Sequence, residues 1–254
     1  MHETLAADAF ALMAVYVLWK LMLRQVVGCA ADTRGWGIET YVSAMVHQIA
    51  TTLVTLHLLT VHFSVLSSWL GTTWVDARVP GLRLERGFFL MQAAEMLTDA
   101  MMHYHYPGFK TTYLLHHAFT LLAAAAAVFA HIPVGGCICF GAAMELGGLS
   151  LNVVSLWPSL TRSTHVPLEL YTARVVVFVG SRVVAAAVMA RTTQLSVTSS
   201  AGLQCYLAEA LAWCIIFINF RWVITMVRSF SGRSVSKEAG RALDGDEHMK
   251  AFES

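Results

Sequence analysis

The stretch Tyr113–Ala130, which reads YLLHHAFTLLAAAAAVFA, decides the fold of this chain. Its length approaches the roughly 20 apolar residues that carry a helix across a ~30 Å hydrocarbon core. Two adjacent histidines, His116 and His117, nevertheless lie at its beginning. Ionisable side chains are costly inside a bilayer and by default indicate a functional site. The stretch therefore predicts a membrane helix that carries polar chemistry near one end.

The composition of the whole chain is that of an integral membrane protein. Of its 254 residues, 57% are hydrophobic and 13% are charged, whereas soluble domains are about 25% charged. Backbone groups in lipid need internal partners, so the spans must be helices. We predict an all-α protein with about seven transmembrane helices. The apolar runs are about Leu5–Leu23, Val42–Leu70, Gly87–Met102, Leu114–Ala130, Val134–Leu156, Leu168–Met189 and Ala201–Val227.

Basic residues predict the organisation and orientation of the chain. We expect a first helix and basic loop over 1–40, a membrane domain over 41–228 and a flexible tail over 229–254. The amino-terminal MHET lacks the basic region of a signal peptide, so the first helix is expected to be retained. The predicted spans place ten basic residues on one side of the membrane: Lys20, Arg24, Arg34, Lys110, Arg162, Arg228, Arg233, Lys237, Arg241 and Lys250. They place four on the other side: Arg78, Arg83, Arg86 and Arg191. The positive-inside rule then places the tail in the cytosol.

Charge and cysteine content argue against several classes of partner. A net charge of +1 provides no basic field for nucleic acid. The cysteines form no CxxC framework and are expected to be small buried hydrophobes. They are Cys29, Cys137, Cys139, Cys205 and Cys214. We therefore expect no metal site and no tightly bound cofactor.

Polar residues inside the third run form one helical stripe. Gln92, Glu95, Asp99 and His103 are spaced by 3, 4 and 4 residues, which keeps them on one face of a helix. This stripe cannot face lipid, so we expect Glu95 and Asp99 to face the interior of the bundle. Because these residues interrupt its apolar character, the third helix is expected to be hidden from lipid by its neighbours.

The two histidines of the fourth run point in different directions. Adjacent helical residues diverge by about 100°, and the spacing pairs Tyr113 with His117 and His116 with Thr120 at i,i+4. We therefore predict unequal roles: one histidine contacts a substrate, and the other orients it or bonds Asp99 or Tyr113.

The order of the helices places many polar residues at one depth. Asp99, His103, His116 and His117 flank the same loop, at Lys110, and other helices add residues to the same cytosolic half. These additions are His47, Asn152, Arg174 and Arg221. A water-accessible cavity open to the cytosol is the simplest arrangement for them. The alternative is structural, since intramembrane His, Thr and Asn often only bond one helix to another, at ~0.6 kcal/mol each.

Several motifs together resemble the TLC-domain proteins, the membrane family that contains the ceramide synthases. The resemblance covers about Tyr41 to Arg228 and rests on the twin histidines, the preceding Gly87-Phe-Phe and a glutamate one helix later. The remaining motifs are YVSAMVHQIA with Ser43 and His47, GAAMELGGLSLNVVSL with Glu145, and FVGSRVV with Arg182.

The resemblance implies six helices in a ring around a lipid-sized cavity, preceded by an extra helix, in the endoplasmic reticulum or a related endomembrane. It assigns His116 and His117 to an acyl-transfer site, where imidazole takes a proton or accepts an acyl group. The ceramide synthase signature continues with a histidine–aspartate pair and a further aspartate. This chain has only His131 before Glu145, and Gln92 stands where many members carry an aspartate, so a typical ceramide synthase is not expected.

Two other seven-helix classes fit poorly. A retinal protein needs a lysine in its last helix, and the run over 201–227 has none. A haem protein needs histidines paired across helices, but His57 lies about 80° from the face of His47.

Two functions remain open for the chain. It is either a lipid acyltransferase that uses His116 and His117, with acyl-CoA as co-substrate and Asp99 or Glu95 in place of the missing signature acid, or a non-catalytic lipid binder that regulates membrane composition. The partner is a membrane lipid in both cases, and the sequence does not indicate an oligomeric state. The candidate substrate-binding residues are His47, Glu95, His103, Glu145, Asn152, Arg174 and Arg182.

Overall fold

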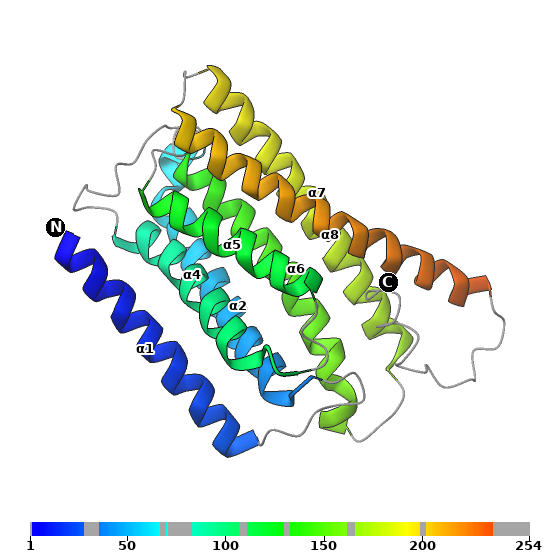
Figure 1. The fold of residues 1–254 in the computed structure, drawn as a ribbon. Coiled ribbons are helices and arrows are strands. Elements are labelled where there is room, and N and C mark those ends of the chain that lie inside the picture. The colour runs from blue at the N-terminus through cyan, green and yellow to red at the C-terminus, as the bar shows by residue number, and fades with distance from the viewer. Residues whose placement is uncertain are drawn as a thin grey trace.

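The structure is a computed structural model that describes residues 2–27, 36–66, 70, 83–106, 111–129, 133–161, 166–198 and 202–235. Its elements are helices throughout these residues, which confirms the predicted all-α class (Figure 1). They are α1 (His2–Val27), α2 (Ile38–Val61), the 3-10 helix η1 (Phe63–Val65), α4 (Arg83–His103), α5 (Thr111–Phe129), α6 (Val134–Thr161), α7 (Leu168–Thr198) and α8 (Leu203–Val235).

Six of these helices are long and apolar enough to cross a membrane: α1, α2, α5, α6, α7 and α8. The helix α4 is the exception among the long helices, because its polar stripe lowers its hydropathy. It packs against α1, α2, α5 and α6, and its residues Glu95, Thr98 and His103 are buried. These neighbours enclose the polar stripe of the helix, and Glu95 is buried as expected, while Leu84 and Met101 at its two ends are exposed.

The contacts between helices close a ring of six. The helix α2 packs against α4, α4 against α5, α5 against α8, α8 against α7, α7 against α6, and α6 against α2. The helix α1 lies outside this ring and contacts α2 and α4. Figure 1 shows α1 along one flank of the molecule, with α7 and α8 on the opposite flank. A ring of six with one preceding helix is the arrangement that the TLC resemblance implies.

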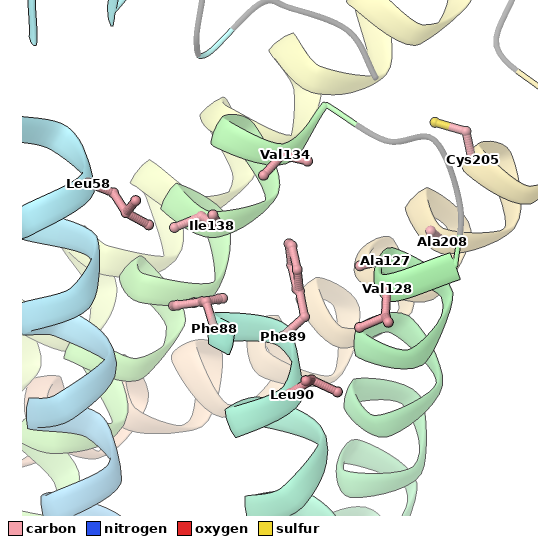
Figure 2. Close-up of a cluster of buried hydrophobic side chains, with 10 residues drawn as sticks. All are labelled: Leu58, Phe88, Phe89, Leu90, Ala127, Val128, Val134, Ile138, Cys205 and Ala208. Atoms are coloured by element: carbon pink, nitrogen blue, oxygen red, sulfur yellow. The ribbon is translucent and has the colours of Figure 1, made fainter. Parts of the chain in front are cut away.

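One end of the ring is filled by an apolar cluster, which we call the apolar plug. Figure 2 shows its residues converging from the end of α2, the beginning of α4, the end of α5 and the beginnings of α6 and α8. They are Leu58, Phe88, Phe89, Leu90, Ala127, Val128, Val134, Ile138, Cys205 and Ala208. A Cβ on Gly141 of α6 would collide with the ring of Phe88, so α4 and α6 touch across the ring at this end. The apolar plug therefore fills this end of the ring, with Ser196 and Glu209 bonded to Cys205 at its edge.

The opposite end of the ring is lined by aromatic side chains. The ring of Tyr113 lies 5.0 Å from that of Trp36 and 5.4 Å from that of Trp222, measured between centroids. Trp222 in turn lies 5.7 Å from His116. The twin histidines therefore sit beneath an aromatic layer at the end of the ring away from the apolar plug.

Two element boundaries differ from those predicted. The second apolar run was expected to reach Leu70, but α2 ends at Val61, where His62 turns toward α4 and approaches Glu85 at 3.2 Å. The last helix extends through 229–235, which we had placed in the tail. The rest of the predicted tail, 236–254, lies outside the described residues, as do Cys29, Arg34, Lys110 and His131.

Candidate functional site

A charged cluster is buried between α1 and α4. Lys20 of α1 is only 1% exposed, and its Nζ donates to Asp99 Oδ1 at 2.8 Å and lies 3.1 Å from Glu95 Oε2. We had counted Lys20 among the basic residues that flank the first span. This was wrong, because the structure places Lys20 within α1 and against the acidic stripe of α4. A buried ammonium needs such partners, since an isolated one would cost several kcal/mol.

The same aspartate holds two histidines. Asp99 Oδ1 accepts from His103 Nδ1 at 2.5 Å, and Asp99 Oδ2 accepts from His117 Nε2 at 2.9 Å. The other ring nitrogen of His117, Nδ1, lies 2.7 Å from the carbonyl oxygen of Tyr113. The prediction that one of the twin histidines bonds Asp99 or Tyr113 is confirmed for His117, which bonds both.

The partners of His117 determine its protonation state. A carboxylate and a carbonyl both accept hydrogen bonds, and both ring nitrogens of a histidine donate only in the imidazolium form. The charge of the cluster supports the imidazolium form of His117, because the cations Lys20 and His117 then balance the anions Glu95 and Asp99. His117 has no free lone pair in this arrangement, so it is not placed to act as a base.

His116 is in a different environment from its neighbour. Its side chain is half-buried, and its Nδ1 has no hydrogen-bond partner among the described residues. The expected bond to Thr120 is absent from this part of the chain, because Thr120 Oγ1 is also without a partner there. His116 contacts the rings of Trp222 and His117 instead. Of the two histidines, His116 is the one with bonding capacity left for another molecule.

His116 belongs to a second group of residues, which we call the polar layer. Each of the six ring helices contributes one member, and distances of 3.7 and 2.9 Å join His47 to Glu145 and Arg182 to Asn219. The members are His47 (α2), Gln92 (α4), His116 (α5), Glu145 (α6), Arg182 (α7) and Asn219 (α8). Polar groups concentrated at one level of a membrane ring create a local site for polar parts of a ligand.

Arg182 is the anchored cation of the polar layer. Its Nε donates to Asn219 Oδ1 at 2.9 Å, and its Nη1 donates to the backbone carbonyl of Met144 at 2.8 Å. Gly147 of α6 makes this approach possible, because a Cβ there would overlap Arg182 Nη1 and Ser181 Oγ. The guanidinium is therefore held in a fixed orientation against α6, the helix that carries Glu145.

Glu145 makes no hydrogen bond of normal length to His47, another member of the polar layer. Its Oε1 lies 3.7 Å from His47 Nε2, which is longer than a hydrogen bond. His47 is held from the other side by Tyr16 of α1, whose hydroxyl lies 2.7 Å from His47 Nδ1. The amide of Gln92 also approaches Glu145, but Gln92 Nε2 has no hydrogen bond of normal geometry among the described residues.

The structure brings most of the predicted site residues together and leaves two apart. Glu95, Asp99, His103 and His117 form the charged cluster, while His47, His116, Glu145 and Arg182 join the polar layer. Asn152 bonds Gln48 at 3.0 Å and links α6 to α2. Arg174 lies over the ring of Tyr171 at 4.5 Å.

A shallow, open depression lies on the surface of α7, and its lining does not include the twin histidines. It is lined by residues of α7, Leu168, Glu169, Thr172, Ala173, Val176 and Val177. A lipid-sized cavity at the polar layer therefore stays a prediction.

Three residues of the site escaped the sequence reasoning. Lys20 and Tyr16 were overlooked because α1 was placed outside the membrane domain, although both occur within an apolar run. Asn219 lies in the apolar sequence IIFINFRW, and the rule that intramembrane polar residues indicate sites would have found it.

Comparison with known proteins adds no relative. The chain matches no protein-family model, no curated protein sequence and no solved structure.

Proposed function

We propose that this multi-pass membrane protein binds the polar part of a membrane lipid at the polar layer and acylates it, with His116 as the proton acceptor. The observation that carries this proposal is the division between the twin histidines. His117 is bonded to Asp99 and Tyr113 through both ring nitrogens, while His116 Nδ1 has no hydrogen-bond partner within the part of the chain that the structure describes. One imidazole is thus held in place, and the other is available for chemistry.

The proposed reaction uses acyl-CoA as the acyl donor. His116 takes the proton from the nucleophilic group of the lipid as that group attacks the thioester carbonyl. The new bond to carbon forms, the carbon–sulfur bond breaks, and His116 returns the proton to the departing thiolate. His117, as an imidazolium, contributes a fixed positive charge beside the reacting base.

The proposal extends to the family and the cellular location of the protein. The six-helix ring and the twin histidines support membership of the TLC-type proteins, and we place the protein in the endoplasmic reticulum or another endomembrane with its carboxy terminus in the cytosol. The polar layer and the aromatic side chains around Tyr113 lie toward the end of the ring opposite the apolar plug. Acyl-CoA would enter from that side, which the basic residues assign to the cytosol.

Activity of purified protein tests the proposal. Full-length chain in nanodiscs is supplied with acyl-CoA and a panel of lipid acceptors, and acylated product is measured by mass spectrometry. We expect His116→Asn to abolish product, His117→Asn to lower it, and His57→Asn on the exposed face of α2 to leave it unchanged. Equal activity in His116→Asn and the parent would refute the role of His116.

The second candidate function is lipid binding without catalysis. The observation that favours it is the full charge balance of the buried clusters, which is also what a rigid scaffold needs. Such a binder would co-purify with stoichiometric lipid, form no product with acyl-CoA, and retain its lipid in both histidine variants.

A further inference from the structure

The space between His47, Gln92 and Glu145 contains polar groups that lack hydrogen bonds to one another. His47 and Gln92 are 3% and 5% exposed, and neither His47 Nε2 nor Gln92 Nε2 has a hydrogen-bond partner among the described residues. Both groups approach the carboxylate of Glu145. Buried polar atoms left in this state cost free energy unless water or a ligand satisfies them.

The donor and acceptor pattern of this space can be assigned. A lone pair on His47 Nε2 would face the carboxylate of Glu145, which is repulsive, so His47 Nε2 carries a hydrogen. In the neutral ring that follows from this, His47 Nδ1 accepts from the hydroxyl of Tyr16. The space then offers two donors, His47 Nε2–H and the Gln92 amide, together with one acceptor, the Glu145 carboxylate.

A hydroxyl group is the complement of this pattern. It donates one hydrogen bond and accepts two, and the 3.7 Å between His47 Nε2 and Glu145 Oε1 is short enough for one oxygen to contact both. A protonated amine would satisfy Glu145 but leave both donors unpaired. A carboxylate or phosphate would satisfy the donors but face the negative charge of Glu145.

The net charge of the polar layer also favours an uncharged head group. With neutral histidines, Glu145 and Arg182 are its two charged members, and they cancel. A charged head group would therefore add an uncompensated charge to a buried site, whereas an uncharged one would not.

We propose that His47, Gln92 and Glu145 bind the hydroxyl group of an uncharged lipid alcohol. This inference rests on the proposed function, since it names the class of lipid that the ring receives.

Three amphiphiles of equal chain length test the inference: 1-hexadecanol, hexadecylamine and palmitate. Their binding to the purified full-length chain is measured with radiolabelled compounds, alongside Glu145→Ala and the matched control Glu209→Ala. Glu209 is also buried, but it lies near the beginning of α8 and accepts a hydrogen bond from Ser196 of α7. We expect 1-hexadecanol to bind at least about tenfold more tightly than either charged compound, a difference that corresponds to about 1.4 kcal/mol. Glu145→Ala should weaken its binding about fivefold or more, which is the loss of one buried hydrogen bond, and Glu209→Ala should not.

The outcomes separate this inference from the proposed function. Tighter binding of hexadecylamine or palmitate that depends on Glu145 would overturn the hydroxyl assignment and leave a lipid site in place. Binding of all three that is insensitive to Glu145→Ala and His116→Asn would overturn both. If Glu145→Ala does not elute as folded protein, Gln92→Leu removes a donor without removing a charge, and unchanged 1-hexadecanol binding in that variant would refute the inference.

Discussion

Replacing Lys20 by methionine should destabilise the protein strongly, because the change leaves Glu95 and Asp99 with one cation between them. The ammonium lies 2.8 Å from Asp99 and 3.1 Å from Glu95. At an effective dielectric constant of about 20, Coulomb's law gives attractions of about 6 and about 5 kcal/mol for these separations. Desolvation offsets part of this attraction, and breaking a buried pair by removing one partner typically costs about 3–5 kcal/mol.

The assay for Lys20→Met is thermal unfolding in detergent, followed by a fluorophore that reacts with cysteines as they become exposed. Cys205 is buried in the apolar plug and reports loss of the ring, whereas Cys214, which was expected to be buried, is exposed and reacts in the folded protein as well. The double variant Lys20→Met, Glu95→Gln removes one negative charge as well and should recover part of the lost stability. A single variant that unfolds within about 2 °C of the parent would refute the reasoning, since a loss of 3–5 kcal/mol shifts the midpoint by more than that.

Three further changes test other parts of the structure. Gly147→Val should lower the unfolding temperature, because its side chain would displace Arg182; a midpoint equal to that of the parent would contradict this packing. Phe88→Ala should destabilise the apolar plug by about 3–5 kcal/mol, the usual cost of a large cavity, and a loss below about 1 kcal/mol in the same thermal assay would show that the plug is loosely packed. A carboxy-terminal tag should be digested by protease added to intact microsomes, and a protected tag would overturn the cytosolic orientation.

Much of the helical fold follows from the sequence, because the length and hydropathy of the runs determine which segments are helices. The polar stripe of α4 was also predictable, since the spacing of Glu95 and Asp99 sets their common face. The pairing across helices was not. That Lys20 bonds Asp99 and that Tyr16 bonds His47 depends on the rotation and depth of α1, α2 and α4, which periodicity within one helix does not determine.

The bonds that α1 makes to the ring helices could not be predicted from local sequence either. Lys20 near the end of an apolar run is ordinarily a residue that reaches the membrane surface, and only the position of α1 against α4 turns it inward to the carboxylates. Tyr16 likewise became a site residue because α1 packs beside α2 and holds His47. Local sequence therefore identified the polar residues of the ring helices, whereas their partners came from the packing of the helices.

The most direct test of the unequal twin histidines is their reactivity with diethyl pyrocarbonate, which acylates a histidine nitrogen that has a free lone pair. The purified protein is treated at neutral pH, and modified peptides are quantified by mass spectrometry, with His105, which is exposed and follows α4, as the internal reference. We predict that His116 is modified and that His117, bonded at both nitrogens, stays unmodified. Modification of His117 at a rate equal to or above that of His116 would contradict the assignment of His116 as the base.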